Sequence, residues 1–446
     1  MVVFFSRDGY RLGDKESLEE LLCDITGIPA LALRCGSLQH FSMAERISWG
    51  KSRITTEPED QAYCLLGILD IRMATYYREG KEKAFQRLTE EMMGSNDSAP
   101  SIIPYHRNFN FVGRKSELAE LEAKLFKANG TTKIAIAGGE GTGKSQLSLE
   151  LAYVMKIRDR KCSISWVDTS SKLSLRQAYM RIAEKLRVSG WNLENPDPIQ
   201  LVKHHLSNNG VSRWLLVFDD VEGPGLDPNE SPDTLSADLN EHLPHSQQGS
   251  AVFTTTDGNI APNLAPQNIV VLEGLTPSAA RSMLCSYLGR SVPANEQQDL
   301  KSLLARLHHQ PIAIRLAAAC IKLTNISITE YQSRIVERGN LYRTLSRDDA
   351  KNAIPVSLII SLEIIDAKHG LAVAFVFFMA CLNWKDIPLD LLKTRVSSNG
   401  DEAMTVLDDY GLIARRPADS AVDLLRPVQR AIRSFAQGTA LVAGMA

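Results

Sequence analysis

The sequence predicts a multidomain protein in which a parallel α/β domain lies between an α-rich amino-terminal segment and helical carboxyl-terminal lobes. Three observations predict this class. The chain has 446 residues, which is too long for one ordinary core. In the middle of the chain, short β-branched runs alternate with helical patterns, as in parallel sheets that are covered on both faces. After about residue 275 the strand patterns become rare and helical patterns dominate.

The composition is that of a folded protein without a strong charge bias. Hydrophobic residues make up 44% and charged residues 23%, and the net charge is -2, so neither disorder nor a nucleic-acid partner is expected. The 7 cysteines are scattered without a CxxC pair, which favours a reducing compartment. The start of the chain lacks a signal-peptide pattern, and the longest apolar run, at 371–382, is too short to cross a bilayer. We therefore expect a cytoplasmic protein without a membrane span.

Changes of pattern divide the chain into five segments. Residues 94–110 hold Ser, Asn, Asp and two prolines without any period, which is typical of a linker. The α-rich segment 1–93 precedes this linker. The α/β domain follows at 111–272, a helical lobe at 273–345, and a second lobe with a short strand pair at 346–446.

The segment GGEGTGKS, at 138–145, matches the pattern G-x-x-x-x-G-K-[ST] in full. The apolar strand pattern KIAIA comes directly before it and the helical pattern QLSLELAYVM directly after it. Glycines let the backbone curl around phosphate oxygens, Lys144 reaches the β- and γ-phosphates, and Ser145 binds Mg²⁺. The sequence therefore predicts a P-loop NTPase domain that binds ATP or ADP with Mg²⁺. The residues expected in this cradle are Gly138, Gly139, Glu140, Gly141, Thr142, Gly143, Lys144, Ser145 and Gln146.

Two further strand patterns end in polar residues. WLLVFDD places Asp219 and Asp220 at the carboxyl end of a buried strand, where ligands bind in open parallel sheets. We expect Asp219 to hold Mg²⁺ with Ser145, and Asp220 to orient or deprotonate the attacking water. The alternative is an Asp-Asp cap or turn after a strand. SAVFTTTD ends in a threonine run, and Thr255 is expected to sense the γ-phosphate unless this strand simply runs into a turn.

The motifs FVGRKSEL, GGEGTGKS, WLLVFDD, VFTTTD and LHHQPIAI occur in this order. Together they resemble the NB-ARC module of STAND ATPases, the switch class of plant resistance proteins and fungal NLR-like proteins, over roughly residues 108–436. The resemblance implies that Val112, Gly113 and Arg114 lie against the base and that Pro311 touches the adenine. It also implies a helical ARC lobe and a winged-helix lobe that close over the nucleotide.

Two positions depart from the pattern of that family. The family usually ends the sensor strand with arginine, where this chain has Asp257. Fungal relatives usually carry a histidine near the end of the winged helix, where this chain has Leu425 followed by Arg426. We expect these changes to leave nucleotide binding in place and to make hydrolysis slow or absent.

The first 93 residues resemble the carboxyl-terminal part of fungal heterokaryon-incompatibility (HET) regions, through FSMAERISWGKSRITTEPEDQAYCLLGILDI and its flanks. The front of such a region is expected before Met1. The two resemblances imply an ADP/ATP-binding switch of a fungal incompatibility or NLR-like protein, with protein partners or self-assembly as its output. The alternatives are a P-loop enzyme, such as a kinase or motor, and a winged-helix DNA-binding regulator. The acidic segment GDEAMTVLDDYGLIARR argues against DNA binding.

Overall fold

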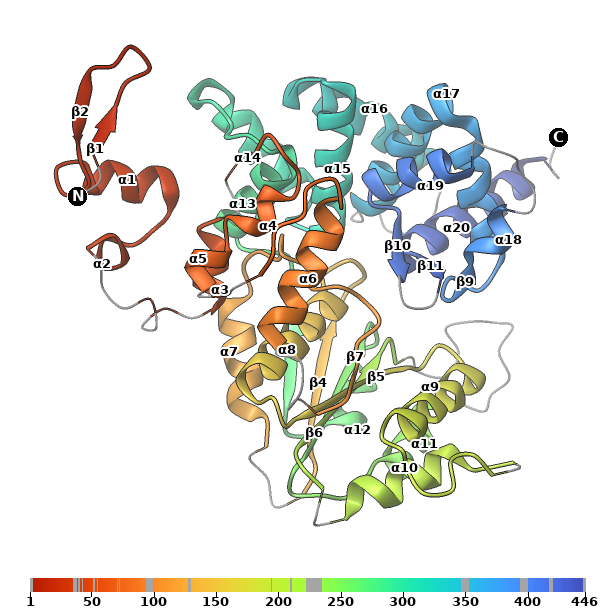
Figure 1. Ribbon diagram of the computed structural model, residues 1–446. Helices are drawn as coiled ribbons and strands as arrows, with labels where there is room; N and C mark the ends of the chain where they lie inside the picture. The colour runs from red at the N-terminus through yellow and green to blue at the C-terminus, as the bar shows by residue number, and fades with distance from the viewer. Residues whose placement is uncertain are drawn as a thin grey trace. The chain divides into compact units, whose positions relative to one another are not determined.

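The computed structural model describes two compact units, Met1–Asp97 and Ser98–Ala446, each with its own packing contacts (Figure 1). The described residues are 3–34, 38, 41, 43–50, 53, 55–69, 71, 73–93, 99–126, 130–193, 195–208, 211–221, 235–345, 353–393, 400–416 and 420–443.

The first unit consists of short elements. Its hairpin joins β1 (Val3–Phe5) to β2 (Arg11–Asp14) in antiparallel register. The helices described after this hairpin are α1 (Glu19–Thr26), α2 (Ala30–Leu33), α3 (Met43–Ser48), α4 (Asp60–Tyr63), α5 (Leu66–Leu69) and α6 (Lys81–Met93). Helix α1 ends at Gly27, which adopts a φ of 67° and donates its N–H to the carbonyl of Cys23. Trp49 and Leu88 are buried in this unit.

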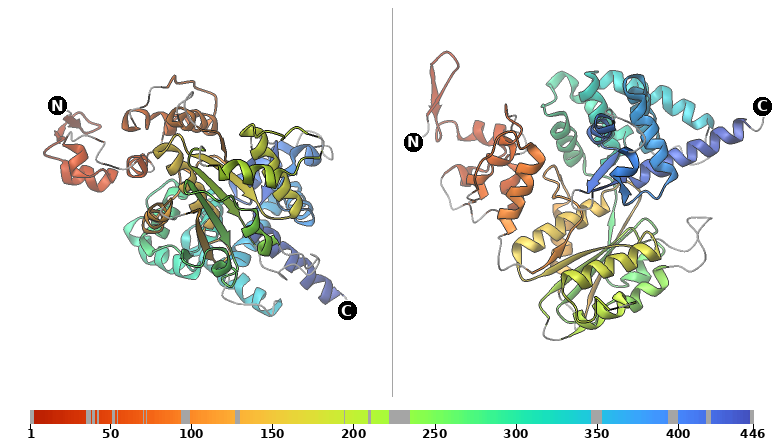
Figure 2. Two further views of the ribbon diagram at one scale, coloured as in Figure 1. Left: turned by 90° about the horizontal axis from the view of Figure 1, so that it is seen from below. Right: turned by 45° about the vertical axis from the view of Figure 1, so that its right-hand side comes forward.

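The second unit is built on a parallel sheet with the strand order β3-β5-β6-β7-β4-β8. The strands are β3 (Ser101–Ile102), β4 (Thr132–Gly138), β5 (Ser163–Asp168), β6 (Trp214–Asp219), β7 (Gly249–Thr255) and β8 (Ile269–Leu272). Every residue of β6 and β7 is buried, as expected for central strands covered on both faces. Seen from below, the strands fan out with the twist of a parallel sheet (Figure 2). The predicted α/β class is confirmed.

Helices alternate with these strands. They are α7 (Lys115–Lys124), α8 (Lys144–Arg158), α9 (Lys172–Lys185), α10 (Pro198–Ser207), α11 (Leu235–His242) and α12 (Ala261–Leu264). Two of them have side-chain caps: Ser171 and Asp197 accept hydrogen bonds from backbone N–H groups in the first turns of α9 and α10.

The predicted linker, residues 94–110, contributes structure to this sheet from residue 99 onward. Ser101–Ile102 forms the edge strand β3 beside β5. Arg107 donates two hydrogen bonds to Glu150 on α8, at 3.1 and 2.7 Å, and both side chains are buried. Residues 99–110 are therefore not a free tether, because a strand pairing and a buried ion pair fix them. The part at 94–98 lies outside the described residues.

The remaining helices share one hydrophobic core, which runs from Leu275 to Ile432. They are α13 (Pro277–Leu288), the 3₁₀ turn η2 (Ala294–Glu296), α14 (Gln297–Arg306), α15 (Pro311–Thr324), α16 (Ile328–Leu345), α17 (Ala353–Cys381), α18 (Leu389–Lys393), α19 (Gly400–Asp409) and α20 (Arg426–Ala443). A small antiparallel sheet, in the order β10-β11-β9, comprises β9 (Ile387–Pro388), β10 (Ile413–Arg416) and β11 (Ala421–Leu424). The two predicted lobes, 273–345 and 346–446, thus share buried side chains.

Helix α17 is longer than the apolar run suggests. Within it, Ile354–Cys381 is the one helix of the described residues that is long and apolar enough to cross a membrane, judged by length and composition alone. Its backbone leaves the helical region at His369, where two helices meet at a kink. Leu358, Ile365, Val376 and Met379 are buried in the shared core. These apolar side chains of α17 therefore pack within this unit.

Candidate nucleotide-binding site

The expected site residues meet at the carboxyl ends of four adjacent strands. Strands β5, β6, β7 and β4 lie side by side and end at Asp168, Asp219, Thr255 and Gly138. Asp168 lies directly opposite Asp219 in the register of β5 and β6. Ligands of open parallel sheets bind at this edge because the loops that follow the strands diverge there.

The loop after β4 curls directly into α8. Gly141 and Gly143 have φ values of 72° and 94°, which residues with a Cβ rarely adopt. Gly143 is the N-cap of α8, so the first N–H groups of this helix have no helical partners. Thr142 Oγ1 donates to the carbonyl of Gly139 at 2.9 Å and fixes the curl. Backbone N–H groups in such a curl, at the positive end of a helix dipole, suit phosphate oxygens.

Lys144 is held inside this loop. Its Nζ donates to the carbonyls of Gly138 and Gly139, at 2.8 Å in each case. The side chain is buried, and burial lowers the pKa of its ammonium group. Neutral carbonyl oxygens are weaker partners for an ammonium group than anionic oxygens. The loop is therefore suited to a phosphate that would give Lys144 an anionic partner.

Ser145 and Asp219 come together where α8 begins and β6 ends. Ser145 Oγ donates to Asp219 Oδ1 at 2.7 Å, and Thr254 Oγ1 donates to the same oxygen at 2.8 Å. Thr254 Oγ1 also accepts a hydrogen bond from the N–H of Asp220 at 2.8 Å. A hydroxyl and a carboxylate are oxygen ligands of the kind that Mg²⁺ prefers. Ser145 and Asp219 thus fit the metal of a P-loop site.

Side chains of both carboxyl-terminal lobes pack directly on the phosphate loop. A Cβ on Gly141 would lie 2.4 Å from Ile312 Cγ2 and 2.8 Å from Ile354 Cδ1. A Cβ on Gly143 would lie 3.8 Å from Cγ of Pro311, the first residue of α15. The loop can approach the lobes this closely because glycine has no side chain.

The segment before α7 also reaches the loop. Gly113 has a φ of 74°, and a Cβ at this position would lie 2.8 Å from Cβ of Ala279. Arg114 donates from Nη2 to the carbonyl of Thr142 at 3.2 Å. Val112 precedes them and is half-buried. The structure therefore brings this segment and Pro311 to the same loop, although they are about two hundred residues apart in the chain.

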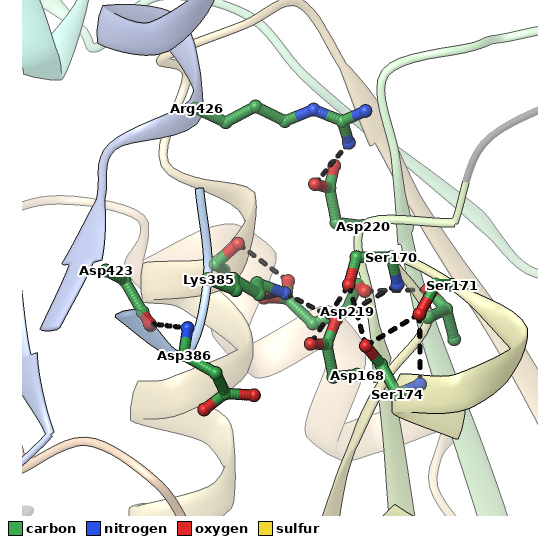
Figure 3. A network of polar contacts seen from close by, with 12 residues as sticks. Asp168, Ser170, Ser171, Ser174, Asp219, Asp220, Lys385, Asp386, Asp423 and Arg426 are labelled. Atoms are coloured by element: carbon green, nitrogen blue, oxygen red, sulfur yellow. Dashed lines mark hydrogen bonds and ion pairs between the residues drawn. The ribbon is translucent and has the colours of Figure 1, made fainter. Parts of the chain in front are cut away.

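Lys385, in the turn between α17 and β9, faces the acids at the ends of β5 and β6 (Figure 3). Its Nζ lies 2.9 Å from Asp168 Oδ1 and 3.6 Å from Asp219 Oδ2. Burial alone would lower the pKa of Lys385, but the carboxylates of Asp168 and Asp219 raise it above its ordinary value. Burial likewise acts to raise the pKa of Asp168, but Lys385 holds it below its ordinary value.

Two arginines at the start of α20 reach the same region. Arg426 forms an ion pair with Asp220, and Arg430 forms one with Glu140 in the phosphate loop. Figure 3 shows Arg426 and Asp220 pointing toward each other. The carboxylate that we expected to handle water is therefore paired with a guanidinium group in this form of the protein.

Residues 114–292 match the model of the NB-ARC domain family. This part of the chain is therefore similar to NB-ARC domains. The predicted parallel sheet, phosphate loop and motif order agree with this match. The prediction of nucleotide binding is thereby confirmed in its general form, whereas ADP, ATP and Mg²⁺ as the particular ligands stay predictions.

Relatives of this chain include two fungal proteins. The chain is 28% identical over 357 residues to a nucleotide-binding leucine-rich repeat (NLR)-like protein of Hyaloscypha variabilis, and the match covers 75% of this chain and 36% of that protein. It is 50% identical over 96 residues to the vegetative incompatibility protein HET-E-1 of Podospora anserina, covering 22% of this chain and 7% of the relative. The predicted likeness to fungal NLR-like and HET proteins is confirmed. The chain spans well under half the length of these relatives.

Among solved structures, the chain is similar to a STAND protein with a tetratricopeptide repeat sensor from Pyrococcus horikoshii. The TM-score is 0.46 at 16% identity, and the match covers 77% of this chain and 44% of that structure.

Two of the predicted residues, Gln146 and Thr255, also bind neighbouring parts of the chain, and their roles at the nucleotide stay predictions. Thr255 Oγ1 accepts a hydrogen bond from the N–H of Asp257 at 3.0 Å, and it is Thr254 that reaches Asp219. Gln146 Oε1 accepts from Asn108 at 2.8 Å, on the segment that follows β3. Leu425 packs against the shared hydrophobic core.

Several residues around this site were not predicted as site residues from the sequence. Asp168 carried a usable signal, because the strand pattern SISWVD ends in an acid just as WLLVFD does. Thr254 belongs to the threonine run that drew attention in the sequence, but which of these threonines faces Asp219 depends on strand register. No sequence signal marked Lys385 or Arg430, because no local pattern reveals a contact between segments that are distant in the chain.

Proposed function

We propose that the chain is the adenine-nucleotide switch of a fungal incompatibility or NLR-like signalling protein. The cradle residues 138–146 hold the phosphates, Ser145 and Asp219 hold Mg²⁺ when it is bound, and Val112, Gly113, Arg114 and Pro311 enclose the base. Mg²⁺ would supply charge neutralisation at the phosphates. Thr254, which reaches Asp219, shares the sensing role with Thr255. The boundaries that we propose are 1–93 for the signalling segment, 111–272 for the nucleotide domain, and 273–345 and 346–446 for the closing lobes.

The observation that carries this proposal is the contact between the carboxyl-terminal lobe and the phosphate site. Lys385, Arg426 and Arg430 all come from that lobe and pair with acids at the cradle. A bound nucleotide favours one of two arrangements of such a lobe only if the nucleotide binds that arrangement more tightly than the other. ADP therefore favours this closed arrangement, and exchange for ATP favours release of the lobe toward protein partners or further copies in the cytoplasm.

Slow or absent hydrolysis follows from the same contacts. Asp220 is paired with Arg426, and a general base must be within reach of the water that it deprotonates. The sensor strand ends with an acid, Asp257, which offers no positive charge to a transferring phosphoryl group. The alternative of a DNA-binding winged helix has less support, because α19 carries Asp401, Glu402 and further acids.

The substitution Lys144→Ala tests the cradle. Removing the ammonium group should weaken ADP binding by about a hundredfold, because a buried charge-assisted contact to phosphate is lost. Isothermal titration of the parent and the variant with ADP measures this. Lys161→Ala, at an exposed position of the same domain, is the matched control and should bind as the parent does. Equal ADP affinity in the parent and Lys144→Ala would show that the loop is not the nucleotide site.

A further inference from the structure

A fixed cation lies beside the acid that is expected to hold the metal. The ammonium group of Lys385 is 3.6 Å from Asp219 Oδ2 and 2.9 Å from Asp168 Oδ1. The Lys385 side chain is only 3% exposed, so water cannot replace this contact easily. Figure 3 shows the Lys385 side chain extending from its own lobe toward the two carboxylates.

The turn that carries Lys385 is held firmly. The N–H of Asp386 donates to Asp423 Oδ1 at 2.9 Å, and the N–H of Leu424 donates to the carbonyl of Trp384 at 2.8 Å. The ring of Trp384 lies under the ammonium group, with its centroid 4.4 Å from Nζ. The turn therefore aims Lys385 at the acids without needing a ligand.

The two acids that face Lys385, Asp168 and Asp219, are also held by hydrogen bonds. The carboxylate of Asp168 accepts hydrogen bonds from the N–H and the hydroxyl of Ser170, at 3.0 and 3.1 Å. Asp219 Oδ1 already accepts from Ser145 and Thr254, and Lys385 faces its other oxygen. Asp219 thus has its charge and hydrogen-bonding needs met with no metal.

A buried carboxylate needs a positive partner, and two positive partners at one buried carboxylate repel each other. A divalent ion bound by Ser145 and Asp219 would sit in the same small, poorly hydrated region as the ammonium group. Repulsion in such a region is weakly screened, so either the ion or Lys385 must leave.

We propose that Lys385 is a built-in substitute for the divalent cation, so that its ammonium group and Mg²⁺ exclude each other at Asp219. Closure of the carboxyl-terminal lobe then selects nucleotide without metal, and Mg²⁺ favours release of the lobe. By linkage, whatever strengthens one of these contacts weakens the other by the same factor. The inference rests on the proposed function, because it assumes that nucleotide and metal share this site.

The test compares ADP affinity in EDTA and in excess MgCl₂, by isothermal titration, for the parent, Lys385→Met and Lys368→Met. Lys368 is exposed on α17 and provides the matched loss of a lysine charge in the same lobe. In the parent and Lys368→Met, Mg²⁺ should change ADP affinity by less than about threefold. In Lys385→Met it should raise ADP affinity by about tenfold or more, since typical coupling factors span this range.

An equal response to Mg²⁺ in all three proteins would overturn the inference while leaving the proposed function intact. Loss of ADP binding by the parent in both buffers would instead overturn the proposed function. If Lys385→Met does not fold, as judged by circular dichroism, Asp168→Asn carries the test. That variant weakens the hold on Lys385 but keeps Ser145 and Asp219. Its response to Mg²⁺ should exceed that of the parent, and an unchanged response would overturn the inference.

Discussion

Gly141 links the phosphate loop to the carboxyl-terminal lobes, and its replacement by alanine should damage both. The residue has a φ of 72°, and a Cβ there would meet Ile312 Cγ2 at 2.4 Å and Ile354 Cδ1 at 2.8 Å. A contact of 2.4 Å between carbon atoms is far inside the optimal separation of about 3.5–4.0 Å, so the lobe or the loop has to shift.

The expected cost of Gly141→Ala has two parts. Holding alanine in the left-handed region costs about 1–2 kcal/mol, and overpacking a close contact costs about 1–3 kcal/mol. Together these predict that the free energy of unfolding falls by about 2–5 kcal/mol. Urea denaturation followed by tryptophan fluorescence measures the change, since Trp214 and Trp166 lie buried in the sheet of the same unit.

Gly289 provides a control that separates the two parts. Its φ of 68° is close to that of Gly141, but nothing lies within 4 Å of an added Cβ. Gly289→Ala should therefore lose only about 1–2 kcal/mol. Adding Ile312→Ala to Gly141→Ala should recover part of the loss by making room. If Gly141→Ala and Gly289→Ala unfold at the same urea concentration, the lobes do not pack closely on Gly141.

Two other changes test contacts described above. Arg107→Met leaves Glu150 buried without its charge partner and should reduce the free energy of unfolding by about 3–5 kcal/mol. A double-mutant cycle with Glu150→Gln, measured by urea denaturation, should give a coupling energy above about 0.5 kcal/mol. A smaller coupling energy would mean that this ion pair contributes little to stability. Leu425→His places a polar ring at a half-buried position that packs against the shared core, and it should cost about 1–3 kcal/mol without slowing ADP release. Slower release of a fluorescent ADP analogue at unchanged stability would show that this position faces the nucleotide.

The sequence predicted best those features whose signals are local. KIAIAG, GGEGTGKS and the following helical pattern are contiguous, and their order alone predicts β4, the loop and α8 in the right arrangement. The apolar run Leu215–Phe218 and the acid directly after it predicted β6 and Asp219 for the same reason. The long apolar pattern of α17 was harder to interpret, because its two halves meet at His369 and only tertiary packing shows that both are used in one core.

Contacts between distant segments could not be predicted. Lys385 and Asp168 are 217 positions apart, and Arg426 and Asp220 are 206 apart. Nothing in the local sequence NWKDIP marks its lysine as different from any solvated lysine. The resemblance to NB-ARC modules pointed to Leu425, yet this side chain packs against the shared core, and its neighbour Arg426 pairs with Asp220.

If this chain holds an adenine nucleotide in the loop that begins at Gly138, the nucleotide should stay with the protein during purification. Denaturing the purified chain and identifying and quantifying the released nucleotide tests this. We expect ADP in an amount close to that of the protein, and none from the Lys144→Ala variant. A protein that is purified empty and binds neither ADP nor ATP when they are added would show that the loop does not hold a nucleotide.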